Sequence, residues 1–217
     1  MNNMENNLDM SLREVLKILQ ERIMKSSHWL GTKALMSPTD FWVYQELIFE
    51  NKPDIIIEIG NRFGGGLLAF AHIQDILKRS TDSIIIGVDI NHHQVSDDVR
   101  NHERIRLIEG DACKSFSLVK ALVDKTPHER IMIIEDSSHT YQNTLNVLNT
   151  YSSLVTKGNY FIVEDSICWH GLDIGPNPGP YEAIEAFAAS NNDFEIDRSK
   201  EDFLITWNPK GFLKKIT

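Results

Sequence analysis

The stretch Ile55-Ile56-Ile57-Glu58-Ile59-Gly60-Asn61-Arg62-Phe63-Gly64-Gly65-Gly66 decides the fold. Its first part is a short β-branched run, which is typical of a parallel strand buried on both faces. Its second part is a glycine-rich turn, and a helical pattern follows over residues 67–79. A strand, a glycine turn and a helix in this order indicate an α/β sheet whose first turn can approach a ligand.

The same alternation continues toward the C-terminus. Apolar runs at 84–86, 105–108, 131–134 and 160–163 predict further strands, and helical patterns occupy 116–125 and 141–155. The polar segment 89–104 has room for only a short helix. This alternation predicts right-handed βαβ units in a doubly wound, mostly parallel sheet.

The two flanks of the chain differ from this middle part. Apolar residues recur at helical spacing from Leu8 to Ile23, a loop is expected at 29–31, and a second helix begins near Ser37-Pro38. Past the fifth strand we expect a mobile loop at 173–180, a helix at 181–189, and strands at 194–197 and 203–206. We therefore predict an N-terminal helical extension over residues 1–50, and one α/β unit over 51–217 with an antiparallel C-terminal edge strand.

Composition excludes several classes of protein. The chain has 217 residues, 41% of them hydrophobic, and a formal net charge of −9. No clustered excess of lysine and arginine is present for nucleic acid, and no apolar run is long enough to insert into a membrane. The two cysteines, Cys113 and Cys168, are too few for a disulfide framework. Residues 1–9 lack the pattern of a signal peptide, so we expect a cytoplasmic protein.

Three strand ends predict an adenosine-bearing cofactor, because ligands of open α/β sheets bind outside the carboxyl ends of the strands. The glycine turn follows the first strand, Asp89 ends the second and suits ribose hydroxyls, and Asp111 after the third could accept a hydrogen bond from an adenine amino group. The predicted cofactor contacts are Glu58, Gly60, Asn61, Arg62, Gly64, Gly65, Asp89, Asp111, Ala112, Asp136 and Ser137.

The turn favours S-adenosylmethionine over a nucleotide with a pyrophosphate. Arg62 stands where the dinucleotide motif has its second glycine, and no Gly-Lys-Ser/Thr follows for a Walker loop. Glu58 would repel phosphate and attract an ammonium or sulfonium group. The plainer interpretation, a packing turn with one acidic end, stays open at this point, as does a nicotinamide cofactor.

The next two strand ends are acidic. Asp136 follows the fourth strand, and Glu164 and Asp165 follow the fifth. If these strands are neighbours, the three carboxylates converge with no lysine or arginine nearby in sequence, and a hard divalent cation such as Mg²⁺ would offset their repulsion. The alternative is that these residues cap the following helices.

A histidine stands beside this predicted metal site. His139 lies three residues after Asp136, so its ring could take a proton from a hydroxyl that the metal has made more acidic. We therefore assign His139 and Asp136 to catalysis. Trp169 and His170, after the fifth strand, are candidates for the substrate side.

Many ordered motifs resemble the cephalosporin hydroxylase family of cephamycin biosynthesis. They are Trp29-Leu30-Gly31, Lys33, Pro38, Asp40, Tyr44-Gln45-Glu46, residues 53–60, Gly64-Gly65, Asp136-Ser137-x-His139, Leu154-Val155-x-x-Gly158-x-Tyr160, Val163-Glu164-Asp165 and Asn208-Pro209-x-Gly211-Phe212-Leu213-Lys214. The resemblance covers nearly the whole chain after residue 28.

This resemblance implies a Rossmann-like class I methyltransferase that uses S-adenosylmethionine and holds Mg²⁺ at Asp136, Glu164 and Asp165. The Asp136-x-x-His139 spacing is also similar to metal-dependent sugar O-methyltransferases of macrolide pathways, in which the histidine is the base. One departure concerns the glycine turn: the family often has Ser or Thr after its paired glycines, whereas Gly66 and Leu67 follow here.

The prediction is therefore a divalent-metal-assisted O-methyltransferase acting on a hydroxyl of a small molecule or sugar. An NAD(P)-dependent oxidoreductase and a non-catalytic member that binds cofactor or metal are the alternatives. The sequence leaves the acceptor open among sugars, hydroxylated natural products and lipid-linked glycans. The aromatic region around Trp29 and Trp42 leads us to expect a homo-oligomer.

Overall fold

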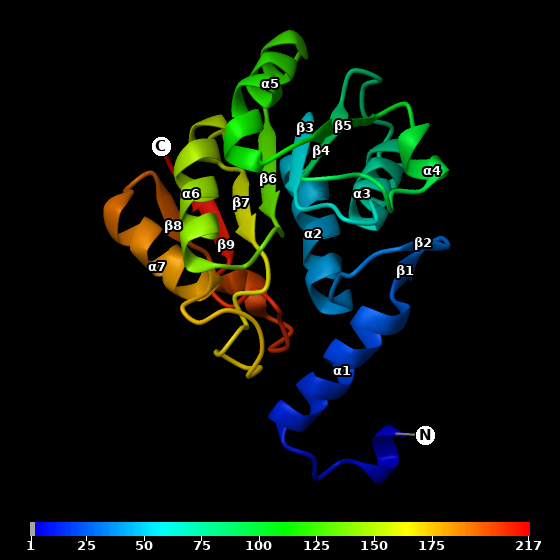
Figure 1. The fold of residues 1–217 in the computed structure, drawn as a ribbon, viewed down its shortest axis with the longest axis vertical. Coiled ribbons are helices and arrows are strands. Elements are labelled where there is room, and N and C mark those ends of the chain that lie inside the picture. Colours follow the sequence, from blue (N-terminus) through cyan, green and yellow to red (C-terminus); the bar gives the residue numbers. More distant parts are fainter. Residues whose placement is uncertain (1–2) are drawn as a thin grey trace.

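The computed structural model describes residues 3–217. Met1 and Asn2, which belong to the N-terminal segment predicted to lack a signal peptide, lie outside the described residues. Seven strands form one sheet in the order β5-β4-β3-β6-β7-β9-β8 (Figure 1). The first five of these are parallel, and the chain order reverses between β3 and β6, which is where such sheets bind ligands. The bounds are β3 (Ile55–Ile59), β4 (Ile84–Asp89), β5 (Ile105–Glu109), β6 (Ile131–Glu135), β7 (Tyr160–Val163), β8 (Phe194–Ile196) and β9 (Phe212–Lys215).

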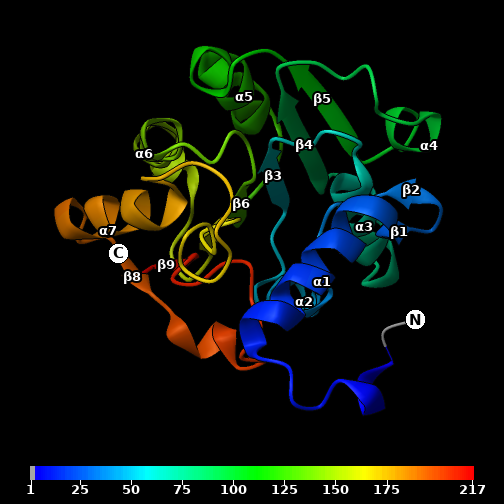
Figure 2. The same ribbon diagram turned by 60° about the horizontal axis from the view of Figure 1, so that its bottom comes forward.

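Helices cover both faces of the sheet, as the apolar runs predict. Strand β3 alternates, so Ile55, Ile57 and Ile59 join the core on one face and Ile56 joins the other. The first face carries α5 (Ala112–Lys125), α6 (Tyr141–Tyr151) and α7 (Pro180–Ser190). The second carries α2 (Pro38–Asn51), α3 (Gly65–Ile76) and the short α4 (Asp97–Arg100) (Figures 1 and 2). The predicted doubly wound α/β fold is confirmed. Within residues 3–217, none of the helices combines the length and the apolar character that crossing a membrane requires.

The first long helix begins later than its apolar pattern suggests. Helix α1 (Leu12–Ser26) follows a capping box in which Ser11 and Glu14 bond each other, and Leu8 lies outside it, 73% exposed. The cap therefore decides the boundary. Leu16 and Ile23 of α1 pack against residues 167, 172 and 207 in a small cluster separate from the two sheet cores. Helix α2 belongs to the sheet core instead, and the domain boundary near residue 50 stays a prediction.

The predicted loop at 29–31 is wrong in detail, because it is the turn of a small hairpin. Strands β1 (His28–Trp29) and β2 (Thr32–Lys33) pair antiparallel, and the two turn residues Leu30 and Gly31 have φ of 46° and 93°. Positive φ at both central residues matches the twist of a tight hairpin. Trp29 is half-buried against Phe41 rather than free.

The strand predicted at 203–206 is also wrong. Phe203 and Leu204 are 49% and 78% exposed, whereas Phe212 and Leu213 of β9 are fully buried. Strand β9 inserts antiparallel between β7 and β8, so the outer edge is β8. Two short apolar runs compete for this place, and only the run that packs on both faces of the sheet becomes the strand.

Candidate active site

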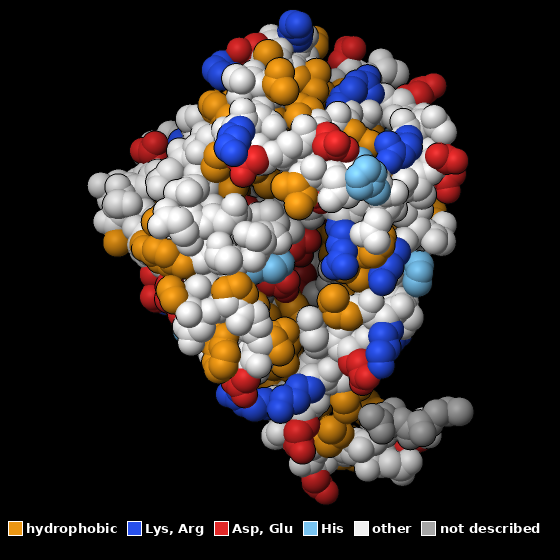
Figure 3. Space-filling model, viewed as in Figure 1, with side chains coloured by type: hydrophobic (Ala, Val, Ile, Leu, Met, Phe, Trp, Pro, Cys, Tyr) orange, Lys and Arg blue, Asp and Glu red, His pale blue; other side chains and the backbone are white. Residues whose placement is uncertain are grey.

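A cleft of about 670 Å³ lies across the carboxyl ends of the central strands. In Figure 3, acidic side chains and a histidine gather in a hollow near the middle of this face, with basic side chains beside them. Of the residues predicted to bind the cofactor or the metal or to act in catalysis, all line this cleft except Gly64, which is the N-cap residue of α3. The lining predicted residues are Glu58, Gly60, Asn61, Arg62, Gly65, Asp89, Asp111, Ala112, Asp136, Ser137, His139, Glu164 and Asp165.

The glycine turn brings backbone close to backbone at the end of β3. Gly60 has φ of 90°, and a Cβ there would overlap the backbone carbonyl of Asp136. A Cβ on Gly65 would overlap the carbonyl of Lys33. The turn is therefore sterically closed to side chains at these points, and it joins the first strand end directly to the fourth.

The two acidic residues at the ends of β4 and β5 have local partners. The backbone N–H of Arg62, whose φ is 39°, donates to Asp89 Oδ2 at 2.7 Å, so this carboxylate fixes the turn. Asp111 caps α5, with Lys114 N–H donating to Oδ1 at 3.0 Å. Ser137 Oγ donates to Glu135. The expected contacts of Asp89, Asp111 and Ser137 with a cofactor stay predictions.

Glu58 is a buried carboxyl whose environment favours a cationic ligand. The residue is 4% exposed, and its Oε2 has no hydrogen-bond partner. Burial, and then repulsion from Asp89, raise the pKa of Glu58 to about 8. A sulfonium or ammonium group in the cleft would offset both effects. The residues present therefore fit S-adenosylmethionine at this end.

The predicted metal residues gather at the ends of β6 and β7. His139 Nε2 lies 3.3 Å from Asp165 Oδ2 and 3.8 Å from Asp136 Oδ1. One ligand atom from each of these three residues lies within 4.8 Å of the others. Capping is not their role, because Thr140 caps α6 and Gly179 precedes α7.

Glu164 approaches the same place from a different direction. It is 6% exposed, lines the cleft, and its Oε1 accepts a hydrogen bond of 2.9 Å from the Tyr44 hydroxyl. It lies outside the close set formed by Asp136, His139 and Asp165. The sequence predicted a group of three carboxylates. In the structure, His139 lies close to Asp136 and Asp165, and the Tyr44 hydroxyl contacts Glu164.

Within the described residues, His139 is the only basic side chain that pairs with this acidic group. Burial, and then repulsion from Glu164 and Asp165, raise the pKa of Asp136 well above its usual range. Burial, and then repulsion from Asp165, do the same for the pKa of Glu164. Within residues 3–217 no lysine or arginine forms an ion pair with any of the three. A divalent cation with oxygen ligands fits this donor set.

Backbone strain is concentrated here as well. His139 and Asp165 have φ of 55° and 56°, a left-handed conformation that costs a non-glycine residue about 1 kcal/mol. The ring of His139 turns Nε2 toward the carboxylates, while Nδ1 is buried without a partner. Surrounding contacts must hold both residues in place.

The rest of the cleft is formed by segments that the motifs do not identify. Helix α1 contributes Gln20, Ile23 and Met24, and Ile174 and Trp207 come from the C-terminal half.

Trp169 and His170, expected on the substrate side, do not line the cleft. His170 pairs with Glu182 at 2.7 Å and stacks on Tyr181, and the Trp169 indole donates to Gly175.

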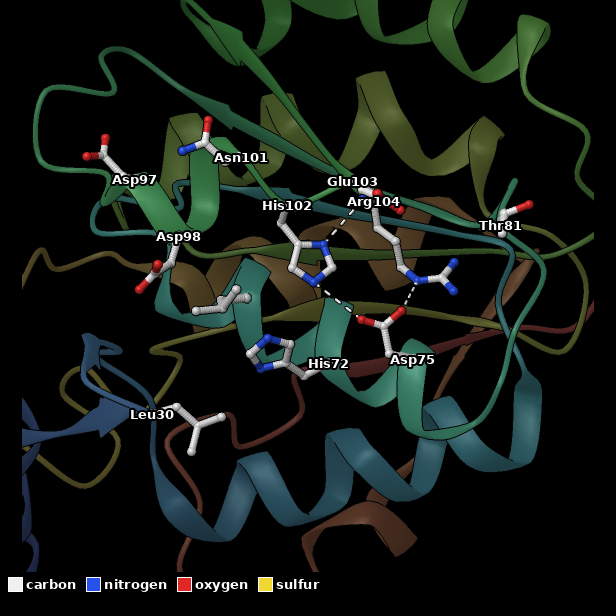
Figure 4. A pocket seen from close by; sticks show the side chains of 11 residues that line it. Leu30, His72, Asp75, Thr81, Asp97, Asp98, Asn101, His102, Glu103 and Arg104 are labelled. Atoms are coloured by element: carbon white, nitrogen blue, oxygen red, sulfur yellow. Dashed lines mark hydrogen bonds and ion pairs between the residues drawn. The ribbon is translucent and has the colours of Figure 1, made fainter.

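A second cavity of about 530 Å³ lies behind the sheet edge, next to α3 and α4 (Figure 4). It contains two histidines, but their acceptor nitrogens are occupied: Trp29 Nε1 donates to His72 Nδ1, and Arg104 N–H donates to His102 Nδ1. His102 Nε2 faces Asp75, which also accepts from Arg104 Nε. The Trp29–His72 bond anchors the β1–β2 hairpin to α3, and because Nδ1 of each ring already accepts a hydrogen bond, neither ring offers that nitrogen to a metal.

Comparison with known proteins identifies close relatives. The sequence model described as "Rhamnosyl O-methyltransferase/CmcI" matches residues 21–216. A rhamnosyl O-methyltransferase of Mycobacterium leprae is 32% identical over 196 residues, which cover 88% of this chain and 84% of that protein. Its counterpart in Mycobacterium tuberculosis (strain H37Rv) is 32% identical over 190 residues, covering 85% and 76%.

Solved structures share the fold. A CmcI structure described with Mg and SAM has a TM-score of 0.68 and 21% identity, and covers 91% of this chain and 84% of that one. A TDP-rhamnose 3'-O-methyltransferase of calicheamicin biosynthesis has a TM-score of 0.55 and 16% identity, with 93% of each chain covered. These structures are evidence for the fold.

Proposed function

The chain belongs to the rhamnosyl O-methyltransferase/CmcI family, and from that premise we propose that it transfers the methyl group of S-adenosylmethionine to a sugar hydroxyl with the help of Mg²⁺. The family identification confirms the resemblance found in the sequence. It also leaves the nicotinamide-dependent oxidoreductase without support, because the turn lacks the dinucleotide motif as well.

The observation that carries the proposal is the joining of two kinds of site in one cleft. At one end is a glycine turn with a buried, unpartnered Glu58, suited to a cationic cofactor. At the other end are Asp136, Glu164 and Asp165, which would hold the metal. The close approach of Gly60 to the Asp136 backbone, which leaves no room for a Cβ, makes these ends adjacent, and a transfer between two bound molecules requires this.

The chemistry divides between the ligands and the chain. A divalent cation, when bound, supplies positive charge that holds acceptor oxygens and makes a hydroxyl more acidic. The chain contributes the positions: the glycine turn and Asp89 on the cofactor side, and the acidic residues on the acceptor side.

His139 is the proposed base, with Nε2 as the atom that takes the acceptor's proton. Nε2 is the nitrogen that faces Asp136 and Asp165, whose negative charges stabilise the imidazolium that results. The hydroxyl oxygen then attacks the methyl group, and S-adenosylhomocysteine leaves.

The relatives' names indicate a rhamnose-containing acceptor as the first one to test. The proposed acceptor is a free hydroxyl of rhamnose, either as the free sugar or as part of a glycoside. A homo-oligomer and a cytoplasmic location remain predictions from the sequence.

The direct experiment is methyl transfer from isotopically labelled S-adenosylmethionine to a panel of rhamnosides, with Mg²⁺ and with EDTA. We expect label in the sugar only when metal is present. Binding of S-adenosylmethionine without transfer to any rhamnoside or other sugar hydroxyl would support the non-catalytic alternative, and transfer unaffected by EDTA would remove the metal from the mechanism.

A further inference from the structure

The acidic residues after β7 rest on a buried hydrogen-bonded support that comes from two distant parts of the chain. Tyr44 lies on α2, and Asn208 lies in the irregular segment before β9; both are fully buried. Neither side chain lines the cleft. They therefore lie behind the site, where they contact the residues that face it.

The bonds in this support have a defined direction. Asp165 N–H donates to Asn208 Oδ1 at 3.2 Å, which leaves the amide nitrogen of Asn208 to donate to the Tyr44 hydroxyl at 2.6 Å. With its lone pair engaged in this way, the hydroxyl donates its own proton to Glu164 Oε1 at 2.9 Å. One asparagine thus holds the backbone of one acidic residue and, through the tyrosine, the side chain of its neighbour.

The support is itself fixed to the helix. One turn before Tyr44 on α2, the buried carboxylate of Asp40 accepts from Thr206 Oγ1 at 2.5 Å and from Trp207 N–H at 2.8 Å. These bonds hold the segment that carries Asn208 against α2. Because Asp165 has a left-handed φ of 56°, its conformation needs such outside contacts to persist.

We propose that Tyr44 and Asn208 are positioning residues that set the metal affinity of the site by holding Glu164 and Asp165 in place. This inference rests on the proposed function, since it assumes that those two residues bind the metal. Outer partners that orient metal ligands typically change metal affinity by about 10- to 100-fold when they are removed.

The test measures Mn²⁺ binding to the whole protein. The concentration of free Mn²⁺ is determined by electron paramagnetic resonance. Tyr44→Phe removes only the hydroxyl, and we expect it to weaken Mn²⁺ binding about tenfold or more. Asn208→Ala releases both acidic residues and should weaken it further. Calorimetry should give an S-adenosylmethionine affinity within about twofold of the wild type for Tyr44→Phe, because the cofactor end does not use these bonds.

Tyr160→Phe is the matched control. Tyr160 is 3% exposed and is the first residue of β7, the strand that Glu164 follows. Its hydroxyl donates to Asp197 at 2.8 Å, away from the cleft. It should lose a partly buried hydrogen bond yet bind Mn²⁺ as the wild type does.

Three outcomes would overturn the inference. Wild-type Mn²⁺ affinity in Tyr44→Phe would show that the support does not set metal binding. An equal loss in Tyr160→Phe would show a general effect of losing a buried hydroxyl. No Mn²⁺ binding by the wild type would overturn the metal-assisted function together with the inference, whereas the first two results leave that function intact.

Discussion

The two ends of the cleft are built in different ways. The cofactor end is formed mainly by backbone within residues 58–91. It consists of a glycine turn, the start of α3 and the carboxylate of Asp89, which accepts a hydrogen bond from the turn. At the metal end, side chains from β6, β7, α2 and the segment before β9 converge. The comparison shows that a local motif can form the cofactor end, whereas several carboxylates close together need hydrogen bonds from distant segments to hold them in place.

The largest effect is expected where the two ends touch. Gly60→Ala places a Cβ against the Asp136 carbonyl at a φ of 90°, so strain and overlap add. We expect about 3 kcal/mol or more of lost stability, with both S-adenosylmethionine and Mn²⁺ binding impaired. Thermal unfolding and calorimetry measure both.

The control for that change is Gly31→Ala. Gly31 has nearly the same φ, 93°, but nothing within 4 Å of the new Cβ, so only strain of about 1 kcal/mol is expected. Equal stability losses in the two variants would mean that the ends are not in tight contact.

The next effect separates the ends. Asp136→Asn keeps the shape but removes a charge from the metal end. We expect turnover to fall about 10³-fold with Mn²⁺ binding lost, while S-adenosylmethionine binding weakens far less because the glycine turn, Glu58 and Asp89 remain. Asp89→Asn is the reciprocal change and should weaken S-adenosylmethionine binding while Mn²⁺ binding persists. If both variants lost both ligands equally, the two ends would form one site rather than two.

A smaller loss should follow removal of the base alone. For His139→Gln we expect turnover to fall about 10²-fold, with the residual rate rising as the pH rises, because hydroxide then replaces the base. Steady-state rates across pH measure this. His170→Gln, whose ring stacks on Tyr181 outside the cleft, should behave as the wild type. An unchanged rate in His139→Gln would assign the proton to another group.

The mildest change affects stability at the cofactor end. Since burial raises the pKa of Glu58 to about 8 from 4.5, the folded protein keeps a proton that the unfolded chain has released, and stability falls as the pH rises from about 4.5 to about 8. Glu58→Gln stays neutral, so its unfolding temperature without ligands should fall less between pH 5 and pH 8.

Added S-adenosylmethionine should raise the unfolding temperature of the wild type most at pH 8, where its positive charge meets the ionised carboxylate. A Glu58→Gln variant with the wild-type pH dependence would contradict the assignment of this slope to Glu58.

The outcome of each sequence-based prediction follows from the range of the interaction that decides it. The five parallel strands and their helices were predictable, because apolar runs and periodicity are local. The convergence of Asp136 and Asp165 was also predictable, since parallel strand ends meet at one edge. The proximity of His139 followed from its three-residue spacing from Asp136.

Other features were not visible at that range. The strand expected at 203–206 formed at residues 212–215, because two similar apolar runs compete and only packing on both faces selects one. Tyr44 belonged to the predicted second helix and to one of the family motifs, but neither marked it as the partner of a carboxylate 120 positions later.

By itself, then, the sequence determined the alternating fold and the chemical character of each strand end, since both are encoded in residues that lie next to one another. The tertiary structure alone decided how the acidic end is held: which hydroxyl meets Glu164, which amide holds Asp165, and which segments wall the cleft. The physical reason is that a hydrogen bond between buried groups depends on where packing brings two distant segments together, and no periodic pattern along the chain records that meeting.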